Sequence, residues 1–408
     1  MERKIDTIQE AIDWLSQYGE QFDGGVTRLL YSNAWQKAQE ALRSWMDSLD
    51  IKTYYDKIGN LFGKLSSEDE NAGVILVGSH IDTVKQGGKY DGAYGIVAGI
   101  LALNVLKQKY GSPKRHIEVV SLCEEEGSRF PIACWGSGML TGVLTYKDIR
   151  GLKDSEGVMF EEAMNDAGFS LTDRSYNIRS DIEGFIELHI EQGQVLEKLQ
   201  KPIGIVQAIV GQRRFQITVC GESNHAGTTP MNWRKDPVHG AVEMIHKLLA
   251  SVDHYDENLV TTVGQIEVKP NVSNVIADSV VFTVDVRHPN EKVLNIFCES
   301  FLQNFKQIAY ELNVEMTSHL WHEVCSAEMD DHFTKVLKNV CKKRQISYHV
   351  MNSGAGHDAQ LFASFCPTAL LFVPSQGGIS HSSLEYTAPA HLETGLHVLI
   401  DTLYELAY

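Results

Sequence analysis

The segments VILVGSHIDTV (residues 74–84) and IEVVSLCEEEG (residues 117–127) decide the fold of this 408-residue chain. Each opens with a short apolar run, typical of a buried strand, and then turns polar or acidic. Residues 93–109, between them, have the pattern of a helix. Strands that alternate with helices indicate a parallel α/β sheet, whose ligands bind beyond the carboxyl ends of the strands. We therefore expect the functional site to lie where these segments become polar.

The same pattern continues outside these two segments. A further buried strand at 185–190 carries His189. The remaining elements expected in this part of the chain are helices at 5–18, 33–49, 331–343 and 391–406 and strands at 346–350 and 369–373. These elements predict a catalytic domain with a mostly parallel central sheet, built from residues 1–209 and 322–408.

The middle of the chain, residues 210–321, has a different pattern. Its β-branched runs at 215–220, 261–268 and 280–287 are separated by helical segments near 236–250 and 291–312. This predicts an inserted αβ-sandwich domain, which would serve as a lid or a dimerisation surface.

Composition excludes several classes of protein. The hydrophobic fraction of 43% and the charged fraction of 22% are those of a globular protein. The sum of 36 basic and 53 acidic residues gives a net charge of −17, which disfavours binding to nucleic acid. The chain shows no signal peptide and no apolar run long enough for a membrane span. Seven scattered cysteines without a CxxC pair favour a reducing compartment, so we expect a cytoplasmic protein.

Five short motifs carry candidate chemistry, and four of them have a plain structural alternative. His80 could be a loop histidine, Asp91 a turn aspartate and His189 a core residue, while the acidic run before Gly127 could be a solvated face. The fifth, His381, lies in a loop of small residues, GGISHSSLE. Considered jointly, these nitrogen and oxygen donors at strand ends indicate a site for zinc, manganese or a similar divalent ion.

The motifs GSHIDTV, EEEGSRF, HIEQG, GESNHAGTTPM and SGAGHDA resemble those of the dinuclear-metal amidohydrolases related to aminoacylases. The resemblance extends over nearly the whole chain and is strongest for the branch of allantoate and N-carbamoyl-L-amino-acid amidohydrolases. It implies a metallopeptidase-like fold and two divalent ions, Mn²⁺ or Zn²⁺, in each subunit.

The resemblance also implies individual roles in the metal site. His80 and His189 would bind one ion and Glu126 and His381 the other, with Asp91 bridging both. Asp82 would orient His80, and Glu125 would be the general base. Gln192 and His357 would line the pocket.

In the inserted domain, the resemblance implies a homodimer in which His225 stabilises the oxyanion in the partner's active site. Asn274, Arg287 and Arg214 would bind the carboxylate of a small anionic substrate, because a guanidinium grips a carboxylate through two parallel hydrogen bonds. For either arginine, an exposed ion pair is the alternative.

The implied reaction is hydrolysis of a ureido C–N bond. Allantoate, degraded to ureidoglycine, ammonia and carbon dioxide in purine breakdown, is the first candidate substrate. An N-carbamoyl-L-amino acid is the nearest alternative. A metallopeptidase and a non-catalytic binding protein of the same fold are more distant ones.

Overall fold

The computed structural model describes residues 1–408 except 1–4, 6, 172–175, 177 and 253–254. The described chain forms two compact units, the first made of Met1–Gln207 with Glu328–Tyr408 and the second of Ala208–Ala327. The insert expected from the sequence, 210–321, lies within the second unit. Among the described helices, none is both long and apolar enough to cross a bilayer.

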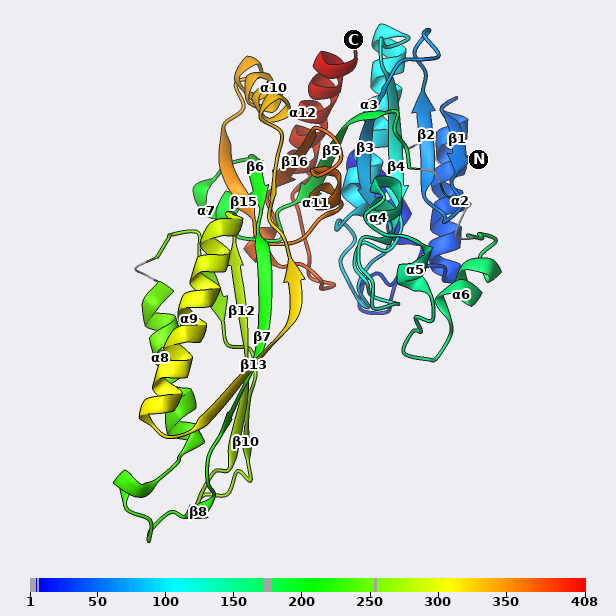
Figure 1. Ribbon diagram of the computed structural model, residues 1–408. Coiled ribbons are helices and arrows are strands. Elements are labelled where there is room, and N and C mark those ends of the chain that lie inside the picture. Colours follow the sequence, from blue (N-terminus) through cyan, green and yellow to red (C-terminus); the bar gives the residue numbers. More distant parts are fainter. Residues whose placement is uncertain (1–4, 6, 172–175, 177, 253–254) are drawn as a thin grey trace. The chain divides into compact units, whose positions relative to one another are not determined.

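A nine-stranded sheet forms the centre of the first unit (Figure 1). Its strands are Lys52–Tyr55 (β1), Leu61–Leu65 (β2), Val74–His80 (β3), His116–Leu122 (β4), Ile182–Ile190 (β5), Ile203–Ile209 (β6), Ala327–Glu328 (β14), Tyr348–Ser353 (β15) and Thr368–Val373 (β16). The order is β1-β2-β4-β3-β5-β16-β6-β14, with β15 paired to β6. Strands β4, β3, β5 and β16 are parallel, while β1, β2 and β6 pair antiparallel. The expected α/β fold with a mostly parallel centre is confirmed.

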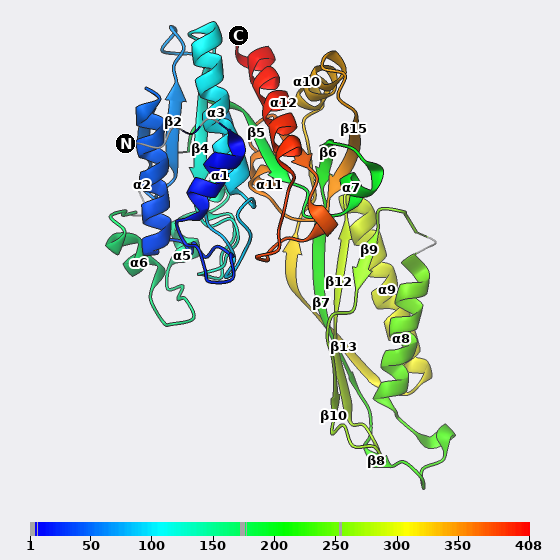
Figure 2. The same cartoon turned by 180° about the vertical axis from the view of Figure 1, so that it is seen from behind.

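Helices cover both faces of this sheet. The helices of the first unit are Ile8–Ser16 (α1), Asn33–Ser48 (α2), Ala93–Tyr110 (α3), Trp135–Thr141 (α4), Tyr146–Ile149 (α5), Phe160–Asp166 (α6), Val195–Leu199 (α7), Asp331–Lys343 (α10), Asp358–Phe362 (α11) and Pro389–Ala407 (α12). Figure 2 shows α1, α3 and α12 on one face, where α3 contacts β3, β4 and β5 and α12 contacts β16. Helix α11 contacts β5 and β16 and packs against α4.

The side chains of β5 alternate between the two faces. Ile186, Leu188 and Ile190 belong to the main core, together with buried residues of α3 and α12. Their neighbours point the other way: Glu187 accepts a hydrogen bond from the first turn of α11, and His189 contacts a histidine just before α11. The strand period therefore delivers His189 to the polar side of the sheet.

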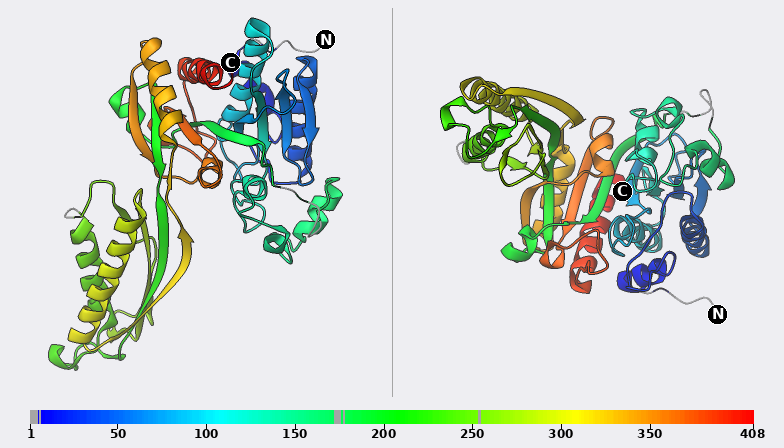
Figure 3. Two further views of the ribbon diagram at one scale, coloured as in Figure 1. Left: turned by 45° about the horizontal axis from the view of Figure 1, so that its top comes forward. Right: turned by 90° about the horizontal axis from the view of Figure 1, so that it is seen from below.

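The second unit has its own core. Its strands are Gly211–Cys220 (β7), Asn224–His225 (β8), Val260–Thr262 (β9), Ile266–Lys269 (β10), Val275–Ile276 (β11), Ser279–His288 (β12) and Glu315–Val324 (β13), and its helices are Pro237–Val252 (α8) and Glu291–Glu311 (α9). The sheet order is β10-β12-β7-β13, with β9 also on β12. Helices α8 and α9 lie side by side on one face (Figure 3). Alternate residues of β12 are buried beneath them, which leaves the other face of the sheet to polar side chains.

The single strand expected at 261–268 is wrong, because β9 and β10 are two strands. They pair with different parts of β12. Between them the main-chain N–H of Gln265 bonds to the side-chain hydroxyl of Thr283, which interrupts the regular ladder.

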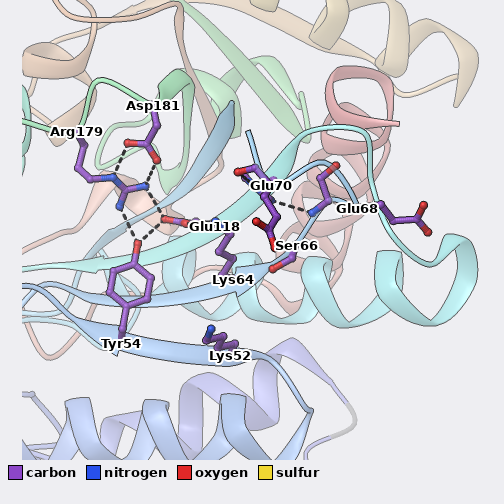
Figure 4. A pocket seen from close by; sticks show the side chains of 11 residues that line it. Lys52, Tyr54, Lys64, Ser66, Glu68, Glu70, Glu118, Arg179 and Asp181 are labelled. Atoms are coloured by element: carbon purple, nitrogen blue, oxygen red, sulfur yellow. Dashed lines mark hydrogen bonds and ion pairs between the residues drawn. The ribbon is translucent and has the colours of Figure 1, made fainter. Parts of the chain in front are cut away.

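A hollow lined by charged side chains lies beside the outer strands of the first sheet (Figure 4). Glu118 of β4, 1% exposed, lies 3.5 Å from Lys64 Nζ and 3.1 Å from Arg179 Nη2, and it accepts a hydrogen bond from Tyr54. Arg179 also binds Asp181. This network neutralises a buried carboxylate with side chains of the chain itself.

Candidate metal centre

Six candidate residues converge at the carboxyl ends of the parallel strands of the first unit. His80 is the last residue of β3, Glu125 and Glu126 follow β4, and His189 is the penultimate residue of β5. Asp91 lies just before α3, and His381 lies in the loop after β16. This is the edge at which a parallel sheet offers a ligand site.

Asp91 lies between two sets of side chains. Its Oδ1 is 3.6 Å from His80 Nε2 and 3.1 Å from His189 Nε2. Its Oδ2 is 3.2 Å from His381 Nε2, which in turn lies 3.3 Å from Glu126 Oε1. Each oxygen of the carboxylate thus faces a different group of donors.

This donor set fits divalent metal ions. The ligand atoms of His80, Asp91 and His189 lie within 4.8 Å of one another, and so do those of Asp91, Glu126 and His381. Two ligands held about 2.1 Å from one ion lie roughly 3–3.5 Å apart at ordinary coordination angles. The nitrogen and oxygen donors suit zinc or manganese.

The hydrogen bonds of two histidines fix which ring nitrogen faces the site. His80 Nδ1 lies 3.0 Å from the carbonyl oxygen of Asp82, and His189 Nδ1 lies 2.9 Å from that of Ile190. A carbonyl only accepts, so each Nδ1 carries a proton, and Nε2 is the nitrogen that can bind a metal ion. The main-chain N–H of Gly92 lies 3.1 Å from His189 Nε2. Both rings therefore turn Nε2 toward Asp91.

Asp82 contacts His80, as the resemblance implies, through its main chain. Its carboxylate Oδ1 is 3.8 Å from Nδ1, too far for a hydrogen bond. The main-chain carbonyl of Asp82 makes that contact instead. The carboxylate accepts from the main-chain N–H groups of Glu125, at 3.2 Å, and Glu126, at 3.1 Å. Asp82 therefore holds the acidic loop in place as well as the ring.

The three consecutive glutamates have separate environments. Glu124 is buried with a positive φ, and its Oε1 accepts from the N–H groups of Arg129 and Phe130. Burial, reinforced by the charge of Asp82, raises the pKa of Glu124 to about 8. Glu125 and Glu126 instead face the histidines. Glu124 therefore holds the loop in place through main-chain hydrogen bonds, whereas Glu125 and Glu126 lie beside the histidines of the candidate metal site.

Electrostatics around Asp91 favour its charged form. Burial raises the pKa of Asp91, but its contacts with the imidazole rings of His189, His381 and His80 outweigh burial and hold that pKa well below its usual range. Burial raises the pKa of Glu125; His80 opposes this effect and Glu126 adds to it. The net result is a Glu125 carboxyl that holds a proton more readily than an exposed one, as a proton carrier requires.

Both residues expected to line the pocket contact this set. Gln192 Nε2 donates to Asp91 Oδ2 at 3.0 Å. The ring of His357 packs edge-on against that of His189, with centroids 4.6 Å apart. Burial, followed by the charge of His189, lowers the pKa of His357, so its ring is neutral.

The sequence did not single out three other residues at the site. Glu385 accepts from the main-chain N–H of Asp91, Ser380 lies beside His381, and Cys134 Sγ is 3.9 Å from Glu125 Oε1. Glu385 lies four residues after His381, at the end of the motif GGISHSSLE. Its closeness to His381 in the sequence is the one signal that could have indicated it.

Four candidate residues belong to the second unit. Arg214 and Arg287 lie on β7 and β12, and both donate to Asp285 at 3.0–3.1 Å. His225 is exposed in β8, which pairs with β11, and Asn274 precedes β11. His225 Nδ1 accepts from the main-chain N–H of Gly227 at 3.0 Å, which leaves the ring proton on Nε2.

Comparisons with known proteins agree with this geometry. The chain is 45% identical over 403 residues to an allantoate amidohydrolase of Bacillus subtilis (strain 168), covering 99% of this chain and 98% of that protein. It is 35% identical to an N-carbamoyl-L-amino-acid amidohydrolase of Pseudomonas sp. (strain NS671), with 96% of each covered. A crystal structure of an amidase of the hydantoinase/carbamoylase family from Burkholderia multivorans superposes with a TM-score of 0.92 at 30% identity, covering 98% of this chain and 97% of that one.

The family assignment follows from the match along most of the chain. Residues 76–405 match the profile of peptidase family M20/M25/M40. That range contains every residue of the candidate metal centre. The chain therefore belongs to peptidase family M20/M25/M40.

Proposed function

We propose that this protein is an allantoate amidohydrolase that uses two divalent metal ions. The observation that carries the proposal is Asp91, whose two oxygens face separate donor groups beside Glu125. The sequence comparisons supply the substrate, because identity to the allantoate enzyme exceeds identity to the N-carbamoyl-L-amino-acid enzyme. The reaction adds one water to allantoate and yields ureidoglycine and carbamate, which breaks down to ammonia and carbon dioxide.

The metal centre and Glu125 would share the work of water activation. Bound divalent ions lower the pKa of water and polarise a carbonyl group. Glu125 takes the proton from water and passes it to the leaving nitrogen, in line with its raised pKa. Asp82 keeps Glu125 in place through its hydrogen bond to the main chain.

The second unit would bind the substrate. Arg214 and Arg287 present guanidinium groups on the polar face of the sheet, which suits a carboxylate. Asn274 would add a neutral hydrogen bond. His225 carries its proton on Nε2, so it can donate to the oxyanion of the tetrahedral intermediate.

We propose a homodimer in which His225 serves the partner's site. Strand β13 ends the order of the second sheet, and its Trp321 side chain is 50% exposed. Exposed apolar side chains also lie on α9, which contacts β13: Ile296 is 57% and Tyr310 is 82% exposed. An edge strand with apolar surface nearby is a natural place for a second copy. We also propose that the enzyme works in the cytoplasm, as a step of purine breakdown.

The alternative is an N-carbamoyl-L-amino-acid amidohydrolase with the same machinery, favoured by the relative at 35% identity. The test is ammonia release from allantoate by the purified protein, after chelation and after addition of Mn²⁺ or Zn²⁺. We expect metal-dependent turnover that exceeds turnover of N-carbamoyl-L-amino acids.

Three outcomes would change this assignment. Negligible turnover of allantoate beside rapid turnover of N-carbamoyl-L-amino acids would favour the alternative. Cleavage of dipeptides alone would indicate a peptidase. Full activity after chelation would contradict the metal centre itself.

A further inference from the structure

The carboxylate of Glu385 connects two of the segments that supply the proposed metal ligands. It is 5% exposed, in the loop that follows β16. Its Oε1 accepts from the main-chain N–H groups of Tyr90, at 3.0 Å, and Asp91, at 3.2 Å. Its Oε2 accepts from the hydroxyl of Ser380, at 2.8 Å, and Ser380 is the neighbour of His381.

Gln192 closes these contacts into a ring. Its Nε2 donates to Asp91 Oδ2 at 3.0 Å and to Ser380 Oγ at 3.1 Å. The single hydroxyl proton of Ser380 goes to Glu385, so its oxygen is available to accept from Gln192. The ring thus passes from the Asp91 carboxylate through Gln192, Ser380 and Glu385 back to the Asp91 main chain. It joins segments from three different parts of the sequence.

The backbone near Glu385 is shaped to receive its carboxylate. A Cβ atom on Gly88 would lie 2.0 Å from Glu385 Oε1 and 2.1 Å from its Cδ. Any larger residue at this position would push the Glu385 side chain out of the ring. Gly88 therefore reserves the space in which Glu385 reaches Asp91.

We propose that Glu385 is a positioning residue that sets the direction of the two Asp91 oxygens. Its own oxygens already accept three hydrogen bonds, so it acts through Asp91 rather than as a ligand. The direction of the Asp91 oxygens decides whether both donor groups are complete at once. The proposal rests on the proposed function for its activity measurement alone, since metal binding is measured without substrate.

The test is Glu385→Gln in the full-length protein. A glutamine has one acceptor oxygen where the carboxylate has two, so the two main-chain N–H groups and the Ser380 hydroxyl can no longer all donate to separate carboxylate oxygens as they do to Glu385. We expect Mn²⁺, titrated by calorimetry, to bind about ten- to a hundredfold more weakly, as is common for residues that support metal ligands. We expect an altered visible absorption spectrum of the Co²⁺-substituted protein. With allantoate, kcat should fall while KM changes little.

Glu118→Gln is the matched control. It makes the same substitution in an equally buried carboxylate, which is bound by Lys64 and Arg179 away from the ligand set. It should leave Mn²⁺ affinity and the Co²⁺ spectrum unchanged. Gly88→Ala alters no hydrogen-bonding group but displaces Glu385, so it should reproduce the effect of Glu385→Gln.

Unchanged Mn²⁺ affinity and an unchanged Co²⁺ spectrum in Glu385→Gln would overturn the proposal. If Glu385→Gln does not fold, Ser380→Ala decides, because it opens the ring and keeps both main-chain bonds of Glu385. We expect weaker Mn²⁺ binding there too, and wild-type binding would overturn the proposal. If the wild-type protein does not hydrolyse allantoate, the proposed function fails, but the Mn²⁺ and Co²⁺ measurements still test Glu385.

Discussion

Strand β4 and the loop after it carry two groups of carboxylates that have opposite kinds of partner. Glu118, in the middle of the strand, is paired with Lys64 and Arg179. Glu125 and Glu126 follow the end of the strand, and among the described residues their ion-pair partners are histidines. One group is neutralised by permanent cations of the chain, and the other faces side chains that can give up their protons and bind a metal.

The comparison separates a structural charge from a functional one. Buried charge is costly unless it is paired, so each carboxylate needs a positive partner. At Glu118 the partner is always present, and the result is stability. At Asp91, Glu125 and Glu126 the proposed partner is a divalent ion, and the proposed result is a reactive site. Four predictions test this contrast.

The largest effect is expected for Glu125→Gln. The amide keeps the shape of the side chain but cannot carry a proton, so kcat for allantoate should fall by about 10²- to 10⁴-fold. Calorimetric titration should show that Mn²⁺ still binds. Near wild-type turnover would refute the role of Glu125 as the base.

The second prediction concerns the structural group. Glu118→Gln leaves the Lys64 and Arg179 charges without their buried partner, which should cost about 3 kcal/mol of unfolding free energy. Urea unfolding measures this loss, and activity per folded molecule should not change. A loss of metal binding in this variant would erase the distinction between the two groups.

The third prediction concerns the functional group. Removal of the metal by a chelator should lower the unfolding free energy by about 2.7 kcal/mol relative to protein held at 100 times the dissociation constant. Asp91→Ala should abolish this difference, whereas Glu118→Gln should retain it. The readout is the urea midpoint with and without Mn²⁺.

The smallest effect is expected at Asp285 in the second unit. Burial raises its pKa, but Arg287 and Arg214 outweigh burial and hold it below its ordinary value. A lowered pKa stabilises the fold above the unfolded value of about 3.9, and this stability disappears as the pH falls. Asp285→Asn should therefore lose less stability than wild type between about pH 5 and pH 3, by ~0.5–1 kcal/mol. If the urea midpoints of both proteins shift equally between these pH values, the predicted role of Asp285 is wrong.

The sequence predicts the fold well where periodicity is strong. The helix expected at 331–343 has the same bounds as α10, whose start is capped by Asp330. The apolar runs that end in His80 and in the acidic triplet were found because buried parallel strands are continuously apolar. Strand β13 was missed, since most of its residues are exposed and no apolar alternation marks it.

The six residues that lie together at the candidate site were singled out from the sequence, but their contacts and three of their neighbours were not. The motifs indicated His80, Asp91 and His381, because their residue types suit a metal. They could not show that Asp82 contacts His80 through a carbonyl, since main-chain contacts leave no trace in residue type. Glu385 was missed for a related reason: its partners are two main-chain N–H groups and a serine.

The first unit is assembled from two separate parts of the chain, and this affects how the protein is made. A ribosome releases His80 and Asp91 early, but His381 and β16 emerge only after the entire second unit. The nascent chain therefore holds an unfinished first sheet until β16 has been synthesised. Translation that stops before β16 would leave a product without that strand and without His381.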